Sequence, residues 1–343
     1  MRRGAVLAAA MALDLAFGEP PASIHPVVWF GRLTALLERR AGRGSPARDL
    51  ASGATLTLTS LLTAWLAARG AVALLAFGSR RLTLAAAPCL GARSAAGLAG
   101  AMALLAEAWL LKTMLSLRAL AEAAGVVQEA LTNDDIDAAR SGLRSLVSRD
   151  ASALDAPLVA AAAIESVAEN TSDALAAPAL AYAAFGLPGA AVYRAINTLD
   201  AMIGYRGAYE WLGKPTARLD DAANLIPSRL TAVLLTLAAG PQRGRFACQI
   251  AWRDHGRTAS PNAGWPMSTM AGALGVELEK VGHYRLGAPA RRPQARDIGT
   301  AVDLLRRVAA LTLVLVRLVE ASNWRRPQAP QLQCCHRRYR VDC

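Results

Sequence analysis

Clusters of acidic, amide and arginine side chains interrupt an otherwise apolar sequence between Asp150 and Pro266. Polar groups are costly in such surroundings, so their presence indicates a site. In the segment ESVAENTSD, Glu165 and Glu169 share a helical face and Asp173 lies a further turn along. Three converging carboxylates suit a magnesium ion, which prefers carboxylate and phosphate oxygens. A solvated helix face explains the same spacing equally well.

The second cluster, YRAINTLDAMIGYR, follows a broken apolar segment. Tyr193, Asn197 and Asp200 fall on one helical stripe, with Arg194 to one side and Arg206 beyond a glycine. A carboxylate, an amide and an arginine that face one cavity are typical of a polar ligand site. Hydrogen bonds that tie helices together are the alternative explanation, because buried polar groups must pair.

The third cluster, ARLDDAANLIPSRL, places Arg218, Asp220, Asp221 and Asn224 close together. Adjacent aspartates followed by an asparagine are similar to the magnesium–diphosphate motifs of membrane prenyltransferases. Those enzymes usually carry two aspartate-rich motifs, and NTLD does not supply the second. The similarity is therefore weak.

The fourth cluster, WRDHGRTASPNAGWPMSTMAGALG, contains Asn262 and Trp265 in a Pro/Gly-rich segment that we expect to be a loop. Loops of this kind are more often sites than connectors. The sequence contains no phosphate-binding loop, dinucleotide fingerprint or HExxH motif. His25, His255 and His283 stand singly, and a lone histidine is more often structural than a ligand.

Composition indicates a membrane protein. Apolar residues make up 54% of the 343 residues and charged residues only 19%, where roughly 25% is usual. The net charge of +12 comes from dispersed arginines without a basic stripe, which fits a membrane surface and not a nucleic-acid partner. We predict an all-α, polytopic integral protein of the inner (cytoplasmic) cell membrane, with the lipid bilayer as its first partner.

Four to five membrane segments are expected from apolar runs of roughly 20 residues. The candidate runs are 50–68, 82–111, 174–193, 230–240 and 302–319. Residues 174–193 are broken by Pro178 and by the sequence around Gly186. Five arginines between positions 32 and 48 place that loop on the cytoplasmic side.

We predict a single helical membrane domain over residues 1–321. It includes amphipathic cytoplasmic helices at 113–173, joined at Asn133 and Asp134, and a polar loop region at 243–298. Residues 322–343 are expected to form a disordered basic tail. Its cysteines and His336 lack the spacing of a zinc site.

Taken in order, these clusters resemble the cobinamide-phosphate synthase (CobD/CbiB) family of cobalamin biosynthesis, from residue 14 to residue 319. Departures from the family pattern are Ala151, Ala153 and Ala174, and the tail lies outside it. The segments that carry the resemblance are DLAFGEPPASIHPVVWFGR, SRDASALD, AIESVAENTSDALAAP, YRAINTLDAMIGYR, ARLDDAANLIPSRLTA and SPNAGWPMSTMAGALGV.

The resemblance implies ATP-dependent amide synthesis. An aminopropanol unit, free or phosphorylated, is joined to the remaining side-chain carboxylate of adenosylcobyric acid, giving adenosylcobinamide or its phosphate. Magnesium and ATP are then required, and other membrane enzymes of the corrinoid pathway are expected partners. A membrane carrier, a prenyltransferase and a pathway scaffold are the competing interpretations.

Physical roles are assigned by chemistry, because phosphoryl transfer depends on metal ligands, positioning and arginines. The base for the incoming ammonium is Asp200, with His25 as second choice. The metal candidates are Glu165, Glu169, Asp173, Asp220 and Asp221. The phosphate and ATP candidates are Arg149, Arg194, Arg206 and Arg218. The substrate-binding candidates are Tyr193, Asn197, Asn224, Asn262 and Trp265, the last against the apolar edge of the corrin.

These roles demand that all the clusters face one side of the membrane. We therefore expect residues 174–193 to form a re-entrant hairpin broken near Gly186 to Gly189. A cysteine in place of Asp200, in a cysteine-free variant, should be shielded from impermeant thiol reagents added outside intact cells. Rapid labelling there would show that the hairpin hypothesis is wrong.

Overall fold

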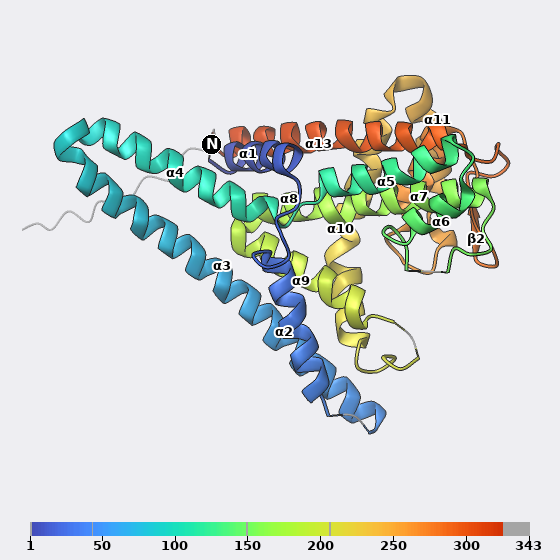
Figure 1. Cartoon of the computed structure of the whole chain (residues 1–343), viewed down its shortest axis with the longest axis horizontal. Helices are drawn as coiled ribbons and strands as arrows, with labels where there is room; N and C mark the ends of the chain where they lie inside the picture. The colour runs from blue at the N-terminus through green and yellow to red at the C-terminus, as the bar shows by residue number, and fades with distance from the viewer. Residues whose placement is uncertain (1, 43, 149, 206, 325–343) are drawn as a thin grey trace, which may run out of the picture.

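The computed structural model describes residues 2–42, 44–148, 150–205 and 207–324, and most of them are helical (Figure 1). The sheet within these residues is a single antiparallel hairpin that pairs Leu278 with Leu286. The elements are α1 (Arg2–Phe17), α2 (Pro26–Arg40), α3 (Pro46–Leu90), α4 (Ala92–Lys112), α5 (Leu117–Thr132), α6 (Ile136–Leu143), α7 (Ala156–Thr171), η1 (Ser172–Ala176), α8 (Ala177–Phe185), α9 (Leu187–Ile203), α10 (Lys214–Ala238), α11 (Gly240–Asp254), η2 (His255–Arg257), α12 (Gly264–Leu274), β1 (Leu278–Lys280), β2 (Tyr284–Leu286) and α13 (Ala295–Trp324). The all-α prediction is confirmed.

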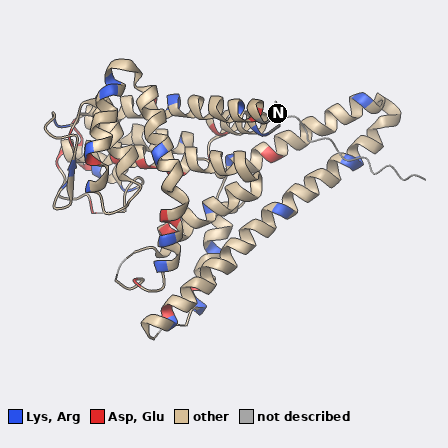
Figure 2. Cartoon of the chain, turned by 180° about the vertical axis from the view of Figure 1, so that it is seen from behind, with Lys and Arg blue, Asp and Glu red and all other residues tan. Residues whose placement is uncertain are grey.

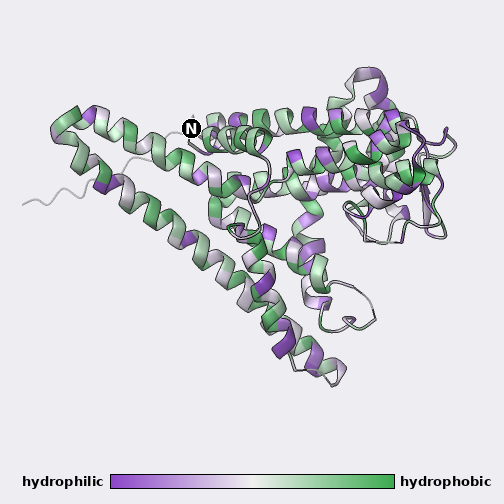
Figure 3. Ribbon diagram, viewed as in Figure 1, coloured by the Kyte–Doolittle hydropathy of each residue, from purple (hydrophilic) through white to green (hydrophobic). Residues whose placement is uncertain are grey.

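Helices α3 and α4 form a long arm that projects from a compact helical bundle (Figure 1). Helix α3 has 45 residues, about 67 Å at 1.5 Å per residue. The two helices turn at Gly91, whose positive φ of 77° suits glycine. Large apolar side chains such as Leu58, Leu74 and Leu84 are exposed on the arm. Much of the ribbon of the arm is coloured as hydrophobic in Figure 3.

Among the described residues, two helical stretches are long and apolar enough to cross a membrane, namely α3 and Ala92–Thr132, which contains α4 and α5. The predicted run 50–68 lies within α3, whereas the run 82–111 is divided at Gly91 between the end of α3 and α4. The membrane assignment therefore rests on these two stretches. Further spans, the re-entrant hairpin and the orientation remain predictions.

The predicted break in residues 174–193 is present. Helix α8 ends at Phe185, and α9 begins at Leu187 after Gly186, whose φ is +70°. The two helices pack against each other. The runs 230–240 and 302–319 lie within the longer helices α10 and α13.

Helix α7 is the centre of the bundle. It packs against α5, α12 and α13, and Ala160 to Ala163 are fully buried on every side of it. Asp155 caps its first turn by accepting a hydrogen bond from the Leu158 backbone N–H at 3.0 Å. Because small side chains allow close packing, α7 can run through the core and deliver its last turn to a cavity.

The region at 113–173 contains α5, α6 and α7, with the predicted junction between α5 and α6 at Asn133 and Asp134. The prediction of amphipathic helices fits α5 and α6 but is wrong for α7, which is buried on every side. The region at 243–298 is more ordered than the predicted polar loop. It contains most of α11, the buried helix α12 and the β hairpin. Pro266 lies near the start of α12, where a missing backbone N–H costs no helical hydrogen bond, so proline did not mark a loop there.

Buried polar contacts join the arm to the bundle. Asp14 of α1 accepts hydrogen bonds from the backbone N–H groups of Leu117 and Arg118, at 2.9 and 3.1 Å, and so caps α5. Lys112, buried at the end of α4, donates to the Gly18 carbonyl. The segment DLAFG therefore fixes the joint where α4 ends and α5 begins.

Close approach at Gly53 makes its replacement by alanine a test of the arm's packing. A Cβ atom there would overlap the carbonyl oxygen of Leu212, just before α10. We expect Gly53→Ala to destabilise the detergent-purified protein by about 1–3 kcal/mol, because backbone must move. Gly70→Ala, also on α3 but with open space at its Cβ, should be neutral or stabilising by up to about 1 kcal/mol. Equal melting temperatures for the two variants would contradict this packing.

Candidate functional site

Four segments enclose a polar cavity of about 400 Å³, which we call the inner chamber. They are the end of α7 with η1, the C-terminal half of α9, the N-terminal half of α10, and the segment from Ser260 to Pro266. The carboxylates that line it are Glu169, Asp173, Asp200, Asp220 and Asp221. Four sequence clusters separated along the chain therefore contribute to one site, as the sequence predicts.

Local backbone geometry directs these side chains. After α7, η1 is a turn of π-helix that carries Asp173. Such turns occur mostly as single insertions within helices and often at functional sites. On α9, the predicted stripe of Tyr193, Asn197 and Asp200 faces the site, with Asn197 and Asp200 lining the chamber. Helical periodicity was therefore a correct guide to α9.

A short hydrogen-bond chain holds Asp220. The Tyr193 hydroxyl donates to Asn224 Oδ1 at 2.7 Å, and Asn224 Nδ2 donates to Asp220 Oδ2 at 3.0 Å. The other oxygen, Asp220 Oδ1, is buried and has no hydrogen-bond partner within the described residues. A buried oxygen of this kind is available for a cation or a donor group of a ligand.

Burial, together with the crowding of like charges, raises the pKa values of three of these carboxyl groups. Burial and the neighbouring Asp200 raise the pKa of Asp220 to about 7. Burial, Glu169 and Asp220 raise the pKa of Asp173 well above its ordinary value. The pKa of Asp200 is raised by burial and by Asp221. A bound cation would relieve this repulsion.

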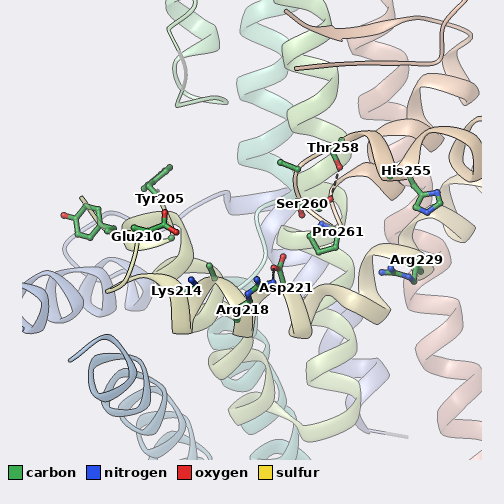
Figure 4. Close-up of a pocket in the computed structure, with 15 residues that line it drawn as sticks. Tyr205, Glu210, Lys214, Arg218, Asp221, Arg229, His255, Thr258, Ser260 and Pro261 are labelled. Atoms are coloured by element: carbon green, nitrogen blue, oxygen red, sulfur yellow. Dashed lines mark hydrogen bonds and ion pairs between the residues drawn. The ribbon is translucent and has the colours of Figure 1, made fainter. Parts of the chain in front are cut away.

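A larger, basic cavity of about 640 Å³, which we call the outer chamber, adjoins the inner one (Figure 4). The two chambers share Gly204, Ala217, Asp221 and Ser260 in their linings. The cationic side chains of Lys214, Arg218 and Arg229 line the outer chamber together with His255, and the acidic residues Glu210 and Asp221 also line it. Guanidinium and ammonium groups in such an arrangement suit phosphate oxygens.

Trp265 supports the outer chamber from behind. Its ring stacks on His255 with centroids 3.9 Å apart, and the Arg229 guanidinium lies 5.2 Å from its centroid. Arg229 also donates to Asn262 Oδ1 at 3.1 Å. Trp265 thus positions two residues of the outer chamber. His255 covers one face of the Trp265 ring, which was predicted to lie against the corrin.

Two predicted residues lie elsewhere. Glu165 is buried on α7 and is not among the described residues that line either chamber. Only the last turn of α7 lines the inner chamber. Glu165 lies one turn earlier, so it does not reach the chamber although it shares a helical face with Glu169. His25 caps α2: its Nδ1 accepts from the Val27 N–H at 3.2 Å, and its Nε2 lies 2.7 Å from a Glu19 carboxylate oxygen. Both ring nitrogens have a partner, and His25 lines neither chamber.

The predicted arginines have different placements. Arg218 lines the outer chamber. Arg194 is largely buried, donates to Asn197 Oδ1 at 3.2 Å and interacts electrostatically with Asp173. Arg149 and Arg206 lie outside the described residues.

Sequence reasoning did not group Lys214, Arg229 and His255, which line the outer chamber together. One signal was present, because Lys214, Arg218 and Asp221 are spaced i, i+4 and i+7 and share a face of α10. The presence of His255 in the outer chamber could not be predicted from the sequence, because it depends on how the segment after α11 packs against α10. The Gly213–Lys214 pair does not match a phosphate-binding loop, because Ala208 stands where that motif needs its first glycine.

The inner chamber fits a magnesium ion held jointly by protein and substrate. Among the described residues, no three His, Cys, Asp or Glu side chains are grouped closely enough to hold a metal ion by themselves. Magnesium, however, is often bound by one or two carboxylates together with substrate phosphates. Asp220 Oδ1, buried and without a partner, is the best-placed protein ligand.

Comparisons with known proteins agree with the resemblance seen in the sequence. A family model described as CobD/Cbib protein matches residues 7–313. A cobalamin biosynthesis protein CobD of Dehalococcoides mccartyi is 37% identical over 89% of this chain and 94% of its own length. A probable cobalamin biosynthesis protein CobD of Methanocaldococcus jannaschii is 39% identical over 82% of this chain and 88% of its own. No solved structure matches significantly.

Replacement of Asp220 by asparagine should flatten the pH dependence of stability in magnesium-free protein. Because the folded pKa of about 7 lies above the unfolded value of 3.8, the folded state binds the extra proton, and stability falls as pH rises between these values. The amide oxygen can still accept from Asn224. We expect the free energy of unfolding of Asp220→Asn to be higher than that of wild type by on the order of 1 kcal/mol at about pH 8.5. The difference should be smaller at about pH 5.

Thermal unfolding in detergent with a chelator measures this effect. Asp303→Asn serves as the control, because Asp303 is exposed and paired with Arg306 on α13. If Asp220→Asn and wild type show the same dependence of melting temperature on pH, the raised pKa of Asp220 is wrong.

Proposed function

The chain belongs to the CobD/Cbib protein family of cobalamin biosynthesis, and on this basis and that of the two chambers we propose that it is an ATP-dependent amide synthase. It joins an aminopropanol unit, free or phosphorylated, to the remaining propionate carboxylate of adenosylcobyric acid. The product is adenosylcobinamide or its phosphate. The corrinoid, the amine and ATP are therefore its proposed substrates.

The observation that carries this proposal is the junction of an acidic and a basic chamber at Asp221. A carboxylate does not condense with an amine at neutral pH, because oxide is a poor leaving group. Transfer of a phosphoryl group from ATP to the carboxylate gives an acyl phosphate and ADP. The amine then displaces phosphate and loses a proton. This sequence needs a cationic region for phosphates next to an acidic region for the ammonium.

The outer chamber supplies the cationic region. Lys214, Arg218 and Arg229 would bind the phosphate oxygens, and the ring of Trp265 fixes the orientation of Arg229. Arg218 lies 4.0 Å from Asp221 and so stands at the boundary between the chambers. A transferring phosphoryl group at this boundary would have positive groups on one side and carboxylates on the other.

The inner chamber would bind and deprotonate the amine. Asp200 is our proposed base, since it lines the chamber on the stripe that also carries Asn197. The amides of Asn224 and Asn262 are held by protein contacts and would orient the amine and its hydroxyl or phosphate group. Magnesium, held by Asp220 and one neighbouring carboxylate, would neutralise phosphate charge.

Membrane attachment is consistent with this role. Helix α3 and the stretch from Ala92 to Thr132 would place the protein in the cytoplasmic membrane, with both chambers facing the cytoplasm where ATP is present. The two chambers lie in the bundle and not on the exposed part of the arm. The soluble substrates could then enter without crossing the bilayer.

Mass spectrometry of the corrinoid tests the proposed reaction. Detergent-purified protein is incubated with adenosylcobyric acid, Mg-ATP and either aminopropanol or its phosphate. A mass gain that matches one of the amines would support the synthase and identify the amine. No gain with either amine, from protein that shows a cooperative thermal transition, would favour a carrier or a scaffold.

Two substitutions should separate the roles of the chambers. Asp173→Asn removes an inner-chamber carboxylate and is expected to lower kcat/KM by about 100-fold or more. Arg229→Gln removes an outer-chamber cation and is expected to raise KM for ATP about 10-fold. Asp303→Asn, far from both chambers on α13, should retain wild-type kinetics. Unchanged kinetics in Asp173→Asn would exclude the inner chamber as the reaction site.

A further inference from the structure

A separate cavity with an apolar lining lies between the arm and helix α9. Its volume is about 390 Å³, within the range of roughly 300–1,000 Å³ of small-molecule sites. Trp29, Phe30 and Leu33 of α2 form one wall, and Leu187 and Ala191 of α9 form another. We call this cavity the arm groove.

The groove has space for a ligand because alanines of α3, with their small side chains, line it. Ala64 and Ala71 line it, where larger side chains would fill the space. Next to them on the same helix, Trp65 and Leu66 are exposed by 41% and 53%. Because α3 is one of the two candidate membrane helices, the groove opens on a surface suited to lipid acyl chains.

The helices that form the groove have a basic end. Helix α2 runs from Leu33, in the groove, to Arg39 and Arg40 in its last turn. Gly42 then lies next to Arg48 at the start of α3. Residues 32–49 contain five arginines against two acidic residues, and the ribbon at this end of the arm carries blue (Lys, Arg) as well as red (Asp, Glu) segments in Figure 2. A ligand with an apolar chain and an anionic head group matches both the groove and this end.

Helix α9 is a common wall between the groove and the inner chamber. Ala195 and Thr198 line the groove, whereas Asn197 and Asp200 line the chamber. Arg194 belongs to both sides: it lines the groove, and its guanidinium donates to Asn197 Oδ1 at 3.2 Å. Occupation of the groove would therefore stabilise the helix that carries part of the site.

We propose that the arm groove binds an acyl chain of one anionic phospholipid, whose head group lies against the arginines at the end of α2 and the start of α3. A flexible acyl chain can enter a slot walled by α2, α3, α4 and α9, whereas a helix of a second copy would be too wide for a cavity of this volume. The inference rests on the groove and its charge and does not require the proposed amide synthesis.

Native mass spectrometry of the delipidated full chain in detergent tests the proposal. The probes are dioleoylphosphatidylglycerol and dioleoylphosphatidylcholine, added at equal concentration. We expect wild type to retain one phosphatidylglycerol, about 10-fold more than phosphatidylcholine. Ala64→Leu with Ala71→Leu fills the groove and is expected to lower retained phosphatidylglycerol at least about fivefold.

Matched variants make the outcome specific. Ala73→Leu is the same change at an exposed position of α3 that does not line the groove, so it should bind as wild type does. Replacing Arg32, Arg39 and Arg40 with glutamine should remove the preference for the anionic lipid. Should the double variant lose its thermal transition, Ala191→Leu fills the groove from α9.

Equal retention of phosphatidylglycerol by wild type and a folded, groove-filled variant would overturn the proposal. Equal retention of the two lipids by wild type would overturn it as well, because the anionic head group would then play no part. Neither result bears on the amide synthase assay, which uses detergent-purified protein and soluble substrates.

Discussion

Five carboxylates confined in one small chamber are the constraint on which this structure depends. Burial first, and repulsion between neighbouring carboxylates second, raise the pKa values of Asp173, Asp200 and Asp220, so keeping these groups charged in the chamber costs free energy. The buried helix α7 and the close glycine contacts around α10 hold them in place by apolar packing elsewhere. The carboxylates thus lower the stability of the fold but create a site that favours cations, as is common at functional sites.

Patterns local to one helix were predictable from the sequence. The stripe on α9, the break at Gly186 and the junction between α5 and α6 follow from helical periodicity and from glycine and turn chemistry. The apolar run within α3 could also be predicted, because the length and hydropathy of a run can be read from the sequence without knowledge of the fold. The all-helical class followed from the same signals.

Features that depend on distant segments were not predictable. Glu165 and Glu169 share a helical face, yet α7 crosses the core and only its end reaches the inner chamber. His25 looked like a free base, but Glu19 and the start of α2 occupy its nitrogens. The outer chamber is lined by α10 and by the segment after α11. No local sequence pattern specifies that this segment packs beside α10. Long-range packing decided each of these placements.

The shared lining of the two chambers has a thermodynamic consequence. Asp221 lines both chambers, so an anion in the outer chamber and a cation in the inner one would lie close enough to attract each other. By linkage, each ligand must strengthen the binding of the other by the same factor. Half-filled states are then disfavoured relative to empty and full ones, which would limit wasteful hydrolysis of a bound nucleotide whenever its partner is absent.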